Sequence, residues 1–373
     1  MLRPAFSSTR SAAAFALLLL LLLLLPVLLT KSILPPREQV YAWSGWDTTG
    51  PHPYQHQVIY EEKGDIDIAF LGSSRLWHGI NTPHVQDLLT EKLGRPAVVR
   101  TIGWGGAGFD ELYFITKDLL QNRKVKMIVF YDEHPPIDQA NSLAPNSFRF
   151  ADDAGTLTAL PWRLKLSYYY AAILGAPKNL LSLLRSCLPA DMSPAKMNSV
   201  QQFYHSEDIV KQLGATTVYL GYNYSTLFED FGPFIPYMPL NHVAPSDVDV
   251  YSPETPSPFQ FSGPPVPDWQ LQFARKFAEL AQQNNVKLVL LHIPKGNDLR
   301  STVINEREFW PDALHADISM VGVPAATLFD GLSDDDARKL FTSFEHLNKN
   351  GQEFYTWLIT PALLKLYAPQ TNH

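Results

Sequence analysis

Ser74 lies at a position in the sequence that suits a catalytic nucleophile. The apolar run from Asp67 to Gly72 predicts a buried strand, and Ser73, Ser74 and Arg75 follow it directly. A turn from this strand into a helix would expose the Ser74 hydroxyl beside the backbone N–H groups that begin the helix. Glycine and serine are also ordinary turn residues, so a plain strand-to-helix turn is the competing interpretation.

Two further segments could contribute to the same chemistry. The glycine-rich stretch Gly103 to Gly108, GWGGAG, follows a second predicted strand and allows close backbone approach. His346 lies in the segment EHLNKNG, just before the last predicted helix, and a histidine there could serve as a general base. We expect these segments and Ser74 to meet at one edge of a sheet.

Alternating strands and helices must position these residues. Such alternation is typical of βαβ units around a parallel sheet. About five parallel strands, covered on both faces, predict a three-layer α/β/α domain whose ligands bind beyond the carboxyl ends of the strands. The predicted strands are 67–72, 97–102, 125–131, 287–293 and 325–329, and the predicted helices are 83–93, 110–120, 269–283, 304–314 and 351–367.

The chain divides into three predicted regions. Residues 1–31 form a cytoplasmic tail and anchor, residues 32–64 a linker or a segment draped over the domain, and residues 65–373 the α/β domain. An insertion at about 134–267, rich in Pro and Tyr and partly helical at 164–184, interrupts the alternation.

Composition narrows the classes of function and site. The chain has 373 residues with 30 basic and 37 acidic side chains, and its net charge of -7 argues against nucleic acid as a partner. The single cysteine, Cys187, excludes an internal disulfide and a four-cysteine zinc site. We expect no cofactor.

The N-terminal segment predicts a membrane anchor. Residues 12–30, AAAFALLLLLLLLLPVLLT, are 19 residues without a charge, close to the ~20 that cross a bilayer. Arg3 and Arg10 precede the segment, which predicts a cytoplasmic N-terminus and an extracytoplasmic domain, periplasmic in a Gram-negative cell. No small-x-small cleavage site follows, so we expect an uncleaved, single-pass anchor rather than a cleaved signal peptide.

The segments LGSSR (71–75), IGWGGAG (102–108) and HLNKNG (346–351) resemble the first, second and last blocks of the SGNH/GDSL hydrolase superfamily. An anchored domain with a serine-arginine first block and an HLN-x-x-G last block is similar to bacterial proteins that work beside membrane-bound O-acyltransferases in polysaccharide acetylation. The resemblance covers roughly residues 65–131 and 269–367 and implies a flavodoxin-like fold.

The resemblance implies a role for each block. Ser74 would be the nucleophile, the amides of Ser74 and Gly106 would form part of an oxyanion hole, and His346 would accept the proton of Ser74. The implied activity is that of a serine esterase or O-acetyltransferase. Its substrates would be acyl esters, such as acetyl esters, of cell-surface glycans, and a membrane-bound O-acyltransferase would be a candidate partner.

The chain departs from the family pattern before the histidine. The family's acid lies three residues upstream, where this chain has Ser343. Three outcomes stay open: a Ser-His dyad helped by a backbone carbonyl, replacement of the acid by Asp330 or by one of the aspartates at 334–336, and loss of catalysis.

A second departure follows the third predicted strand. The family's asparagine is replaced by the segment YDEHP, in which Asp132 would repel an oxyanion and His134 could donate to one. We favour a capped strand end over a metal site for Asp132, Glu133 and His134, because consecutive side chains diverge, and we predict no metal.

Arg75 could bind a carboxylate of an acidic glycan, although a surface salt bridge is the more common fate of such an arginine. His78 and His292 are more simply explained as packed histidines. The alternative to catalysis, which Ser343 and Asp132 favour, is a non-catalytic glycan-binding or assembly subunit on the same fold.

Overall fold

The computed structural model describes residues 6–32, 37–38, 41, 55–104, 108–131, 140–141, 144–171, 234–251, 266–302 and 313–367. The chain forms two compact units. One comprises Met1–Val40 and Ser142–Pro189, and the other comprises Tyr41–Asn141 and Ala190–His373. The larger unit contains the sheet and is described first.

The sheet of the larger unit has six described strands in the order β2-β1-β3-β5-β6-β4. The first five are parallel, and their order is that of a flavodoxin-like sheet. The direction of winding reverses between β1 and β3, which is where such sheets bind ligands. The strands are β1 (Ile66–Ser73), β2 (Val99–Trp104), β3 (Val125–Tyr131), β4 (Asp249–Tyr251), β5 (Lys287–Leu291) and β6 (Ile318–Gly322).

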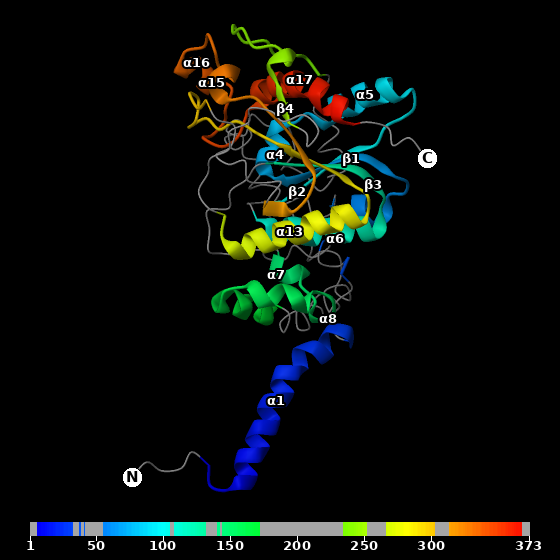
Figure 1. Ribbon diagram of the computed structural model, residues 1–373, viewed down its shortest axis with the longest axis vertical. Helices are drawn as coiled ribbons and strands as arrows, with labels where there is room; N and C mark the ends of the chain where they lie inside the picture. Colours follow the sequence, from blue (N-terminus) through cyan, green and yellow to red (C-terminus); the bar gives the residue numbers. More distant parts are fainter. Residues whose placement is uncertain are drawn as a thin grey trace, which may run out of the picture. The chain divides into compact units, whose positions relative to one another are not determined.

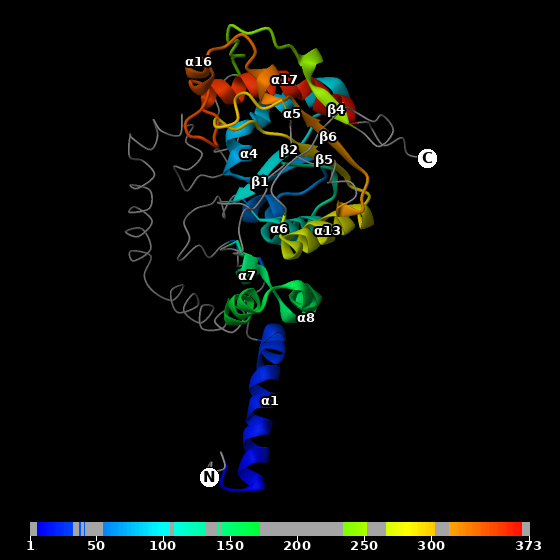
Figure 2. The ribbon, with the colours of Figure 1, turned by 60° about the vertical axis from the view of Figure 1, so that its left-hand side comes forward.

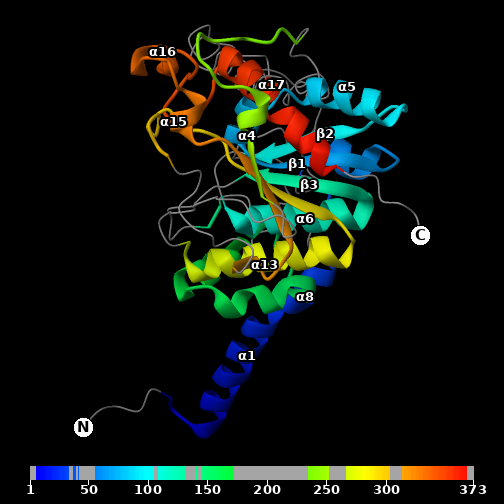
Figure 3. The same cartoon turned by 45° about the horizontal axis from the view of Figure 1, so that its top comes forward.

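Helices cover both faces of this sheet (Figures 1 and 3). On one face lie α6 (Phe109–Asn122) and α13 (Asp268–Gln283), packed side by side. On the other face lie α4 (Ser74–Gly79), α5 (Thr82–Leu93) and α17 (Lys349–Leu366). The three layers are therefore helix, sheet and helix, and α15 (Ala325–Leu328) and α16 (Asp334–Arg338) lie in the connection between β6 and α17.

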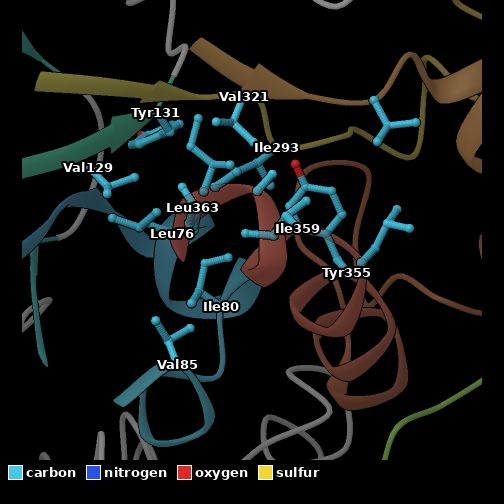
Figure 4. Packing of buried hydrophobic residues seen from close by; sticks show 14 of the residues in the cluster. Leu76, Ile80, Val85, Val129, Tyr131, Ile293, Val321, Tyr355, Ile359 and Leu363 are labelled. Atoms are coloured by element: carbon cyan, nitrogen blue, oxygen red, sulfur yellow. The ribbon is translucent and has the colours of Figure 1, made fainter. Parts of the chain in front are cut away.

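Apolar side chains fill both layers between sheet and helices. Figure 4 shows Val129 and Tyr131 of β3 gathered with Leu76 of α4 and Ile359 of α17, all of which are buried. On the opposite face the rings of Phe130 and Phe277 lie 5.1 Å apart, edge to face. Since β1 is buried along its whole length, it is an almost continuous apolar run, as expected of a central parallel strand.

Local signals begin and end α5. Asn81 caps the helix by accepting a hydrogen bond of 3.2 Å from the N–H of His84, and Pro83 lies in the first turn. Gly94 ends it in the left-handed conformation with a φ of 63°. These signals hold the segment after Ser74 in a defined path back along the sheet.

A buried carboxylate anchors the start of β1, at the end of the sheet away from Ser74. Asp67 accepts hydrogen bonds from Arg95 at 2.5 and 3.0 Å, from Lys126 at 2.9 Å, from the Tyr367 hydroxyl at 2.7 Å and from the Val98 N–H at 2.9 Å. Burial by itself raises the pKa of Asp67, but these hydrogen bonds outweigh burial and hold the pKa well below its usual value.

Most of the predicted elements are confirmed, and one strand is wrong. Residues 325–329 were predicted to form the last strand, but β6 is Ile318–Gly322 and residues 325–328 form α15. A short apolar run fits a buried strand or a helix equally well, and Pro324 here precedes a helix. The sheet also has one more strand than the expected five, because β4 pairs antiparallel with β6.

Two other predicted elements fall partly outside the described residues. The helix predicted at 304–314 overlaps residues 303–312, which lie outside the description, while residues 313–314 are helical. Of the helix predicted at 164–184, residues 164–171 belong to a helix of residues 162–171, and the remainder lies outside the described residues.

The smaller unit contains α1 (Thr9–Ser32), α7 (Ala144–Ser147) and α8 (Phe150–Asp153) (Figure 2). The ring of Phe148 packs edge to face against the buried Tyr168, with centroids 5.4 Å apart. Leucines 17–25 of α1 are exposed by 41–60%. In the part of the chain that the structure describes, no helix meets both the length and the hydropathy required for a membrane span. The transmembrane part of the predicted fold is therefore not confirmed.

Candidate active site

Ser74 is the first residue of α4, at the carboxyl end of β1. Gly72 permits the close approach of β3 just before it, because a Cβ at Gly72 would lie 2.5 Å from the Tyr131 ring. The buried hydroxyl of Ser73 shares a short hydrogen bond with the Tyr131 hydroxyl. These contacts fix the turn at the point where β1 and β3 adjoin, and they leave the Ser74 side chain partly exposed.

A short hairpin-like loop holds His346. Phe341 and Leu347 pair as an antiparallel bridge, and the N–H of Thr342 donates to the carbonyl of His346 at 2.9 Å. Asn348 ends the loop and caps α17, since its side-chain oxygen accepts from the N–H of Gly351 at 3.0 Å. The Asn348 amide also donates to the carbonyl of Lys339 at 2.6 Å.

Gly351 is needed at the start of α17 for a steric reason. A Cβ at this position would lie 2.1 Å from the carbonyl oxygen of Leu340, so the loop and the helix approach too closely for any other residue. In the HLNKNG segment, Asn348 caps α17 and Gly351 allows the close backbone contact. Together these two residues position the imidazole of His346.

Helix α17 also binds the segment after Ser74. The side-chain amide of Gln352 donates to the carbonyls of Trp77 at 2.7 Å and Ile80 at 3.2 Å, and the hydroxyl of Thr356 accepts from the N–H of Asn81 at 2.8 Å. All five residues are buried. These bonds join the two ends of the domain and hold the α4 turn against the helix that carries the His346 loop.

The structure brings the two predicted catalytic side chains together. Ser74 Oγ lies 2.8 Å from His346 Nε2, a hydrogen-bond distance. On the other side of the ring, His346 Nδ1 lies 2.9 Å from the Ser343 hydroxyl, which also accepts from the N–H groups of Glu345 at 3.3 Å and His346 at 3.2 Å. With Nδ1 protonated and donating to Ser343, Nε2 is free to accept the proton of Ser74.

Ser343 is thus the orienting partner of His346. The expected alternatives were a backbone carbonyl or a displaced aspartate, and neither contacts His346 among the described residues. Asp334 pairs with Arg300 at 2.7 Å and Asp336 pairs with Lys339 at 2.7 Å. The residue first identified as a missing acid therefore supplies a neutral hydroxyl in its place.

The environment keeps His346 neutral. Burial lowers the pKa of His346, the positive charge of Arg75 lowers it further, and the negative charge of Glu345 acts in the opposite direction. The ring of His78 packs edge to face against His346 with centroids 4.8 Å apart. Burial, and then the nearby His346, lower the pKa of His78 to about 3, against a hydrogen bond with the backbone of Leu347.

Arg75 is buried, with only 2% of its surface exposed, so the expected surface salt bridge is wrong. Its Nη2 donates a short hydrogen bond to the carbonyl of Ile293, after β5, and its guanidinium lies 5.4 Å from the centroid of the Tyr131 ring. Arg75 forms no ion pair with a described residue. A buried positive charge therefore lies next to Ser74, at the carboxyl edge of the sheet.

Three predicted site residues fall outside the description. Gly106, with the predicted oxyanion amide, and Asp132 and His134, the accessory candidates, all lie in segments that the structure does not describe. Among the described residues, no group of three or more His, Cys, Asp and Glu side chains is arranged to hold a metal ion.

Sequence reasoning missed two residues that support the site. The prediction that His78 is a packed histidine is confirmed, and the ring that it packs against is that of His346. Gln352 and Tyr131 carried no signal in the sequence, because their contacts depend on how α17 and β3 approach α4.

Comparisons with known proteins do not identify a family. No family model matches the chain, and neither a curated protein nor a solved structure matches it.

Proposed function

We propose that the protein is a serine-dependent esterase or O-acyltransferase that forms an acyl-Ser74 intermediate. The observation that carries this proposal is the 2.8 Å contact between Ser74 Oγ and His346 Nε2, at the carboxyl edge of a parallel sheet. The resemblance to the SGNH/GDSL superfamily supports the same assignment, as does the flavodoxin-like strand order.

The reaction would proceed in two steps. His346 accepts the Ser74 proton as Ser74 Oγ attacks the ester carbonyl, and the protonated ring then donates that proton to the departing alcohol oxygen. Water or a sugar hydroxyl next attacks the acyl-Ser74 carbonyl, while His346 takes its proton and returns it to Ser74. Attack by water completes hydrolysis, and attack by a sugar hydroxyl completes transfer.

The proposed substrates are acyl esters of cell-surface glycans. This part of the proposal rests on the resemblance to anchored proteins of polysaccharide acetylation and on the apolar segment at residues 12–30. An anchor there would hold the domain outside the cytoplasmic membrane, close to its polymer and to a membrane-bound O-acyltransferase.

A fluorophosphonate probe tests the nucleophile. We expect purified protein to be labelled at Ser74, and Ser74→Ala to abolish labelling. His346→Ala should slow labelling by about a hundredfold or more, because general-base assistance is worth roughly 10²–10⁴. Ser167→Ala, a substitution in the smaller unit, is the matched control and should label normally.

Absence of labelling in a protein that is folded by circular dichroism would overturn the enzymatic proposal. It would favour the alternative, a non-catalytic glycan-binding or assembly subunit on the same fold. If labelling occurs, adding a sugar acceptor during ester turnover separates the two reactions, since transfer yields an acylated sugar and hydrolysis yields free acid.

A further inference from the structure

Arg75 presents an unusual electrostatic situation beside the Ser74 site. Arg75 is 2% exposed, and its Nη2 donates to the Ile293 carbonyl. Within the described part of the chain, its Nε and Nη1 have no hydrogen-bond partner. A guanidinium has five N–H groups and no means of losing its charge. Burying such a group without a counter-ion is costly, so the arrangement requires an explanation.

The position of Arg75 links it to the reacting groups. It follows Ser74 in α4, stacks on Tyr131 at the end of β3 and bonds to Ile293 beyond β5, so it lies along the strand ends. Its charge reaches the His346 ring, since it lowers the pKa of that imidazole. Figure 4 shows Tyr131, Ile293 and Leu76 of α4 within one cluster of buried side chains.

The groups described near Arg75 leave its charge uncompensated. Ser343, which orients His346, is neutral, and burial keeps His346 and His78 in their neutral forms at neutral pH. Of the acids in the described segments, Glu345 is the one whose charge acts on His346, and its side chain is exposed to water. Among the described residues, the site therefore carries a net positive charge before any ligand binds.

We propose that Arg75 is the counter-ion for a negatively charged substrate, so that the Ser74 site takes sugar esters with an anionic group close to the ester. A carboxylate, sulfate or phosphate matches the charge and the planar donors of a guanidinium. The bound anion balances the positive charge of Arg75 that the described residues leave unopposed. This inference rests on the proposed function, and it names the class of substrate.

Matched sugar esters test the inference. The four probes are acetylated methyl hexosides that differ only at C6, which is a hydroxymethyl group, a carboxylate, a sulfated hydroxymethyl group or a phosphorylated one. We expect at least one charged ester to exceed the neutral one in kcat/KM by about tenfold or more, mainly through KM, because a poorly solvated positive charge attracts an anion strongly. The advantage should shrink as salt is added.

Variants of Arg75 distinguish recognition of a substrate anion from stabilisation of the oxyanion. Arg75→Met should remove the preference for the charged ester, and Arg75→Lys should restore part of it, because the charge returns without the planar donors. Arg300→Met removes an exposed, ion-paired arginine and should leave the preference unchanged. An Arg75→Met variant that loses kcat equally on neutral and charged esters would instead show a role in stabilising the oxyanion and would overturn the inference.

A binding measurement keeps the inference testable apart from catalysis. Ser74→Ala protein, titrated calorimetrically with the unacetylated glycosides, should bind a charged sugar and not the neutral one. If Ser74 is not labelled by the fluorophosphonate but the charged sugar binds through Arg75, the esterase proposal fails and the anion site stands. If neutral and charged sugars bind equally to Ser74→Ala protein and to wild type, the proposed anion site is wrong. This outcome does not depend on whether the Arg75 variants fold.

Discussion

The hydroxyl of Ser343 lies 2.9 Å from Nδ1 of His346, the ring nitrogen that does not contact Ser74. A hydroxyl in this place can orient the imidazole and select its tautomer, as a carboxylate does. It cannot balance the positive charge that the ring gains when it accepts a proton. Orientation and charge stabilisation, which one aspartate provides in the usual triad, are therefore separated in this protein.

Substitutions of Ser343 should separate these two contributions. We expect Ser343→Ala to slow esterase turnover or fluorophosphonate labelling by about tenfold, the effect of one lost hydrogen bond of roughly 1–1.5 kcal/mol. Ser343→Asp should raise the rate, because the carboxylate stabilises the imidazolium. Ser343→Thr keeps the hydroxyl and is the control. An unchanged rate in Ser343→Ala would show that the contact does not assist His346.

The pH dependence of the reaction should reflect the lowered pKa of His346. Only the neutral ring accepts the Ser74 proton, and burial followed by Arg75 lowers its pKa from the usual value near 6.5. Activity should therefore persist as the pH falls below about 6.5 and should decline only at the lowered pKa. The measurement is kcat/KM, or labelling rate, against pH.

Glu345 provides an internal check on this profile. Its charge raises the pKa of His346, so Glu345→Gln should move the acidic limb to still lower pH. Glu91→Gln, an exposed substitution on α5, should not move it. An acidic limb above the ordinary histidine range would contradict the electrostatics described for the site.

Asp67 should stabilise the domain in a pH-dependent manner. Asp67→Asn removes a buried charge that accepts from Arg95, Lys126 and Tyr367, and we expect it to lower the free energy of unfolding at pH 7 by about 2–4 kcal/mol. The folded pKa of Asp67 is lowered, so its contribution is complete above the unfolded value near 3.9 and is lost as the pH falls toward the folded pKa.

Denaturant titrations at neutral and acidic pH measure this effect. The difference in stability between wild type and Asp67→Asn should narrow below about pH 4. Asp334→Asn removes an exposed partner of Arg300 and serves as the control, with a small effect at either pH. A difference that is constant with pH would mean that the Asp67 carboxylate contributes through shape rather than charge.

Gly351 should be intolerant of a side chain. Gly351→Ala places a Cβ 2.1 Å from the Leu340 carbonyl, which forces the His346 loop away from α17, and we expect a loss of about 1–3 kcal/mol together with slower labelling of Ser74. Gly155→Ala is the matched control, because a Cβ there has nothing within 4 Å. Equal thermal stability and labelling of the two variants would show that the loop accommodates the methyl group.

The parallel sheet followed from the sequence because its strands carry their own signal. Strands β1, β3 and β5 are buried on both faces, so they are nearly continuous apolar runs that need no knowledge of their neighbours. The last strand was misplaced because the apolar residues around Ala325 fit either type of element. Strand β4 was missed because three residues, Asp249–Tyr251, are too few to show a period.

Ser74 and His346 could be proposed from the sequence because each lies in a short block with a recognisable neighbour, a strand end in one case and a helix cap in the other. Their chemistry depends on contacts that only the tertiary structure decided. The 2.8 Å approach of the two side chains and the burial of Arg75 arise where segments more than 200 residues apart meet. The Ser343 hydroxyl reaches the imidazole because of how its own loop folds. Local sequence patterns predict the helix or strand to which a residue belongs. The pKa and the contacts of its side chain depend on how these elements pack.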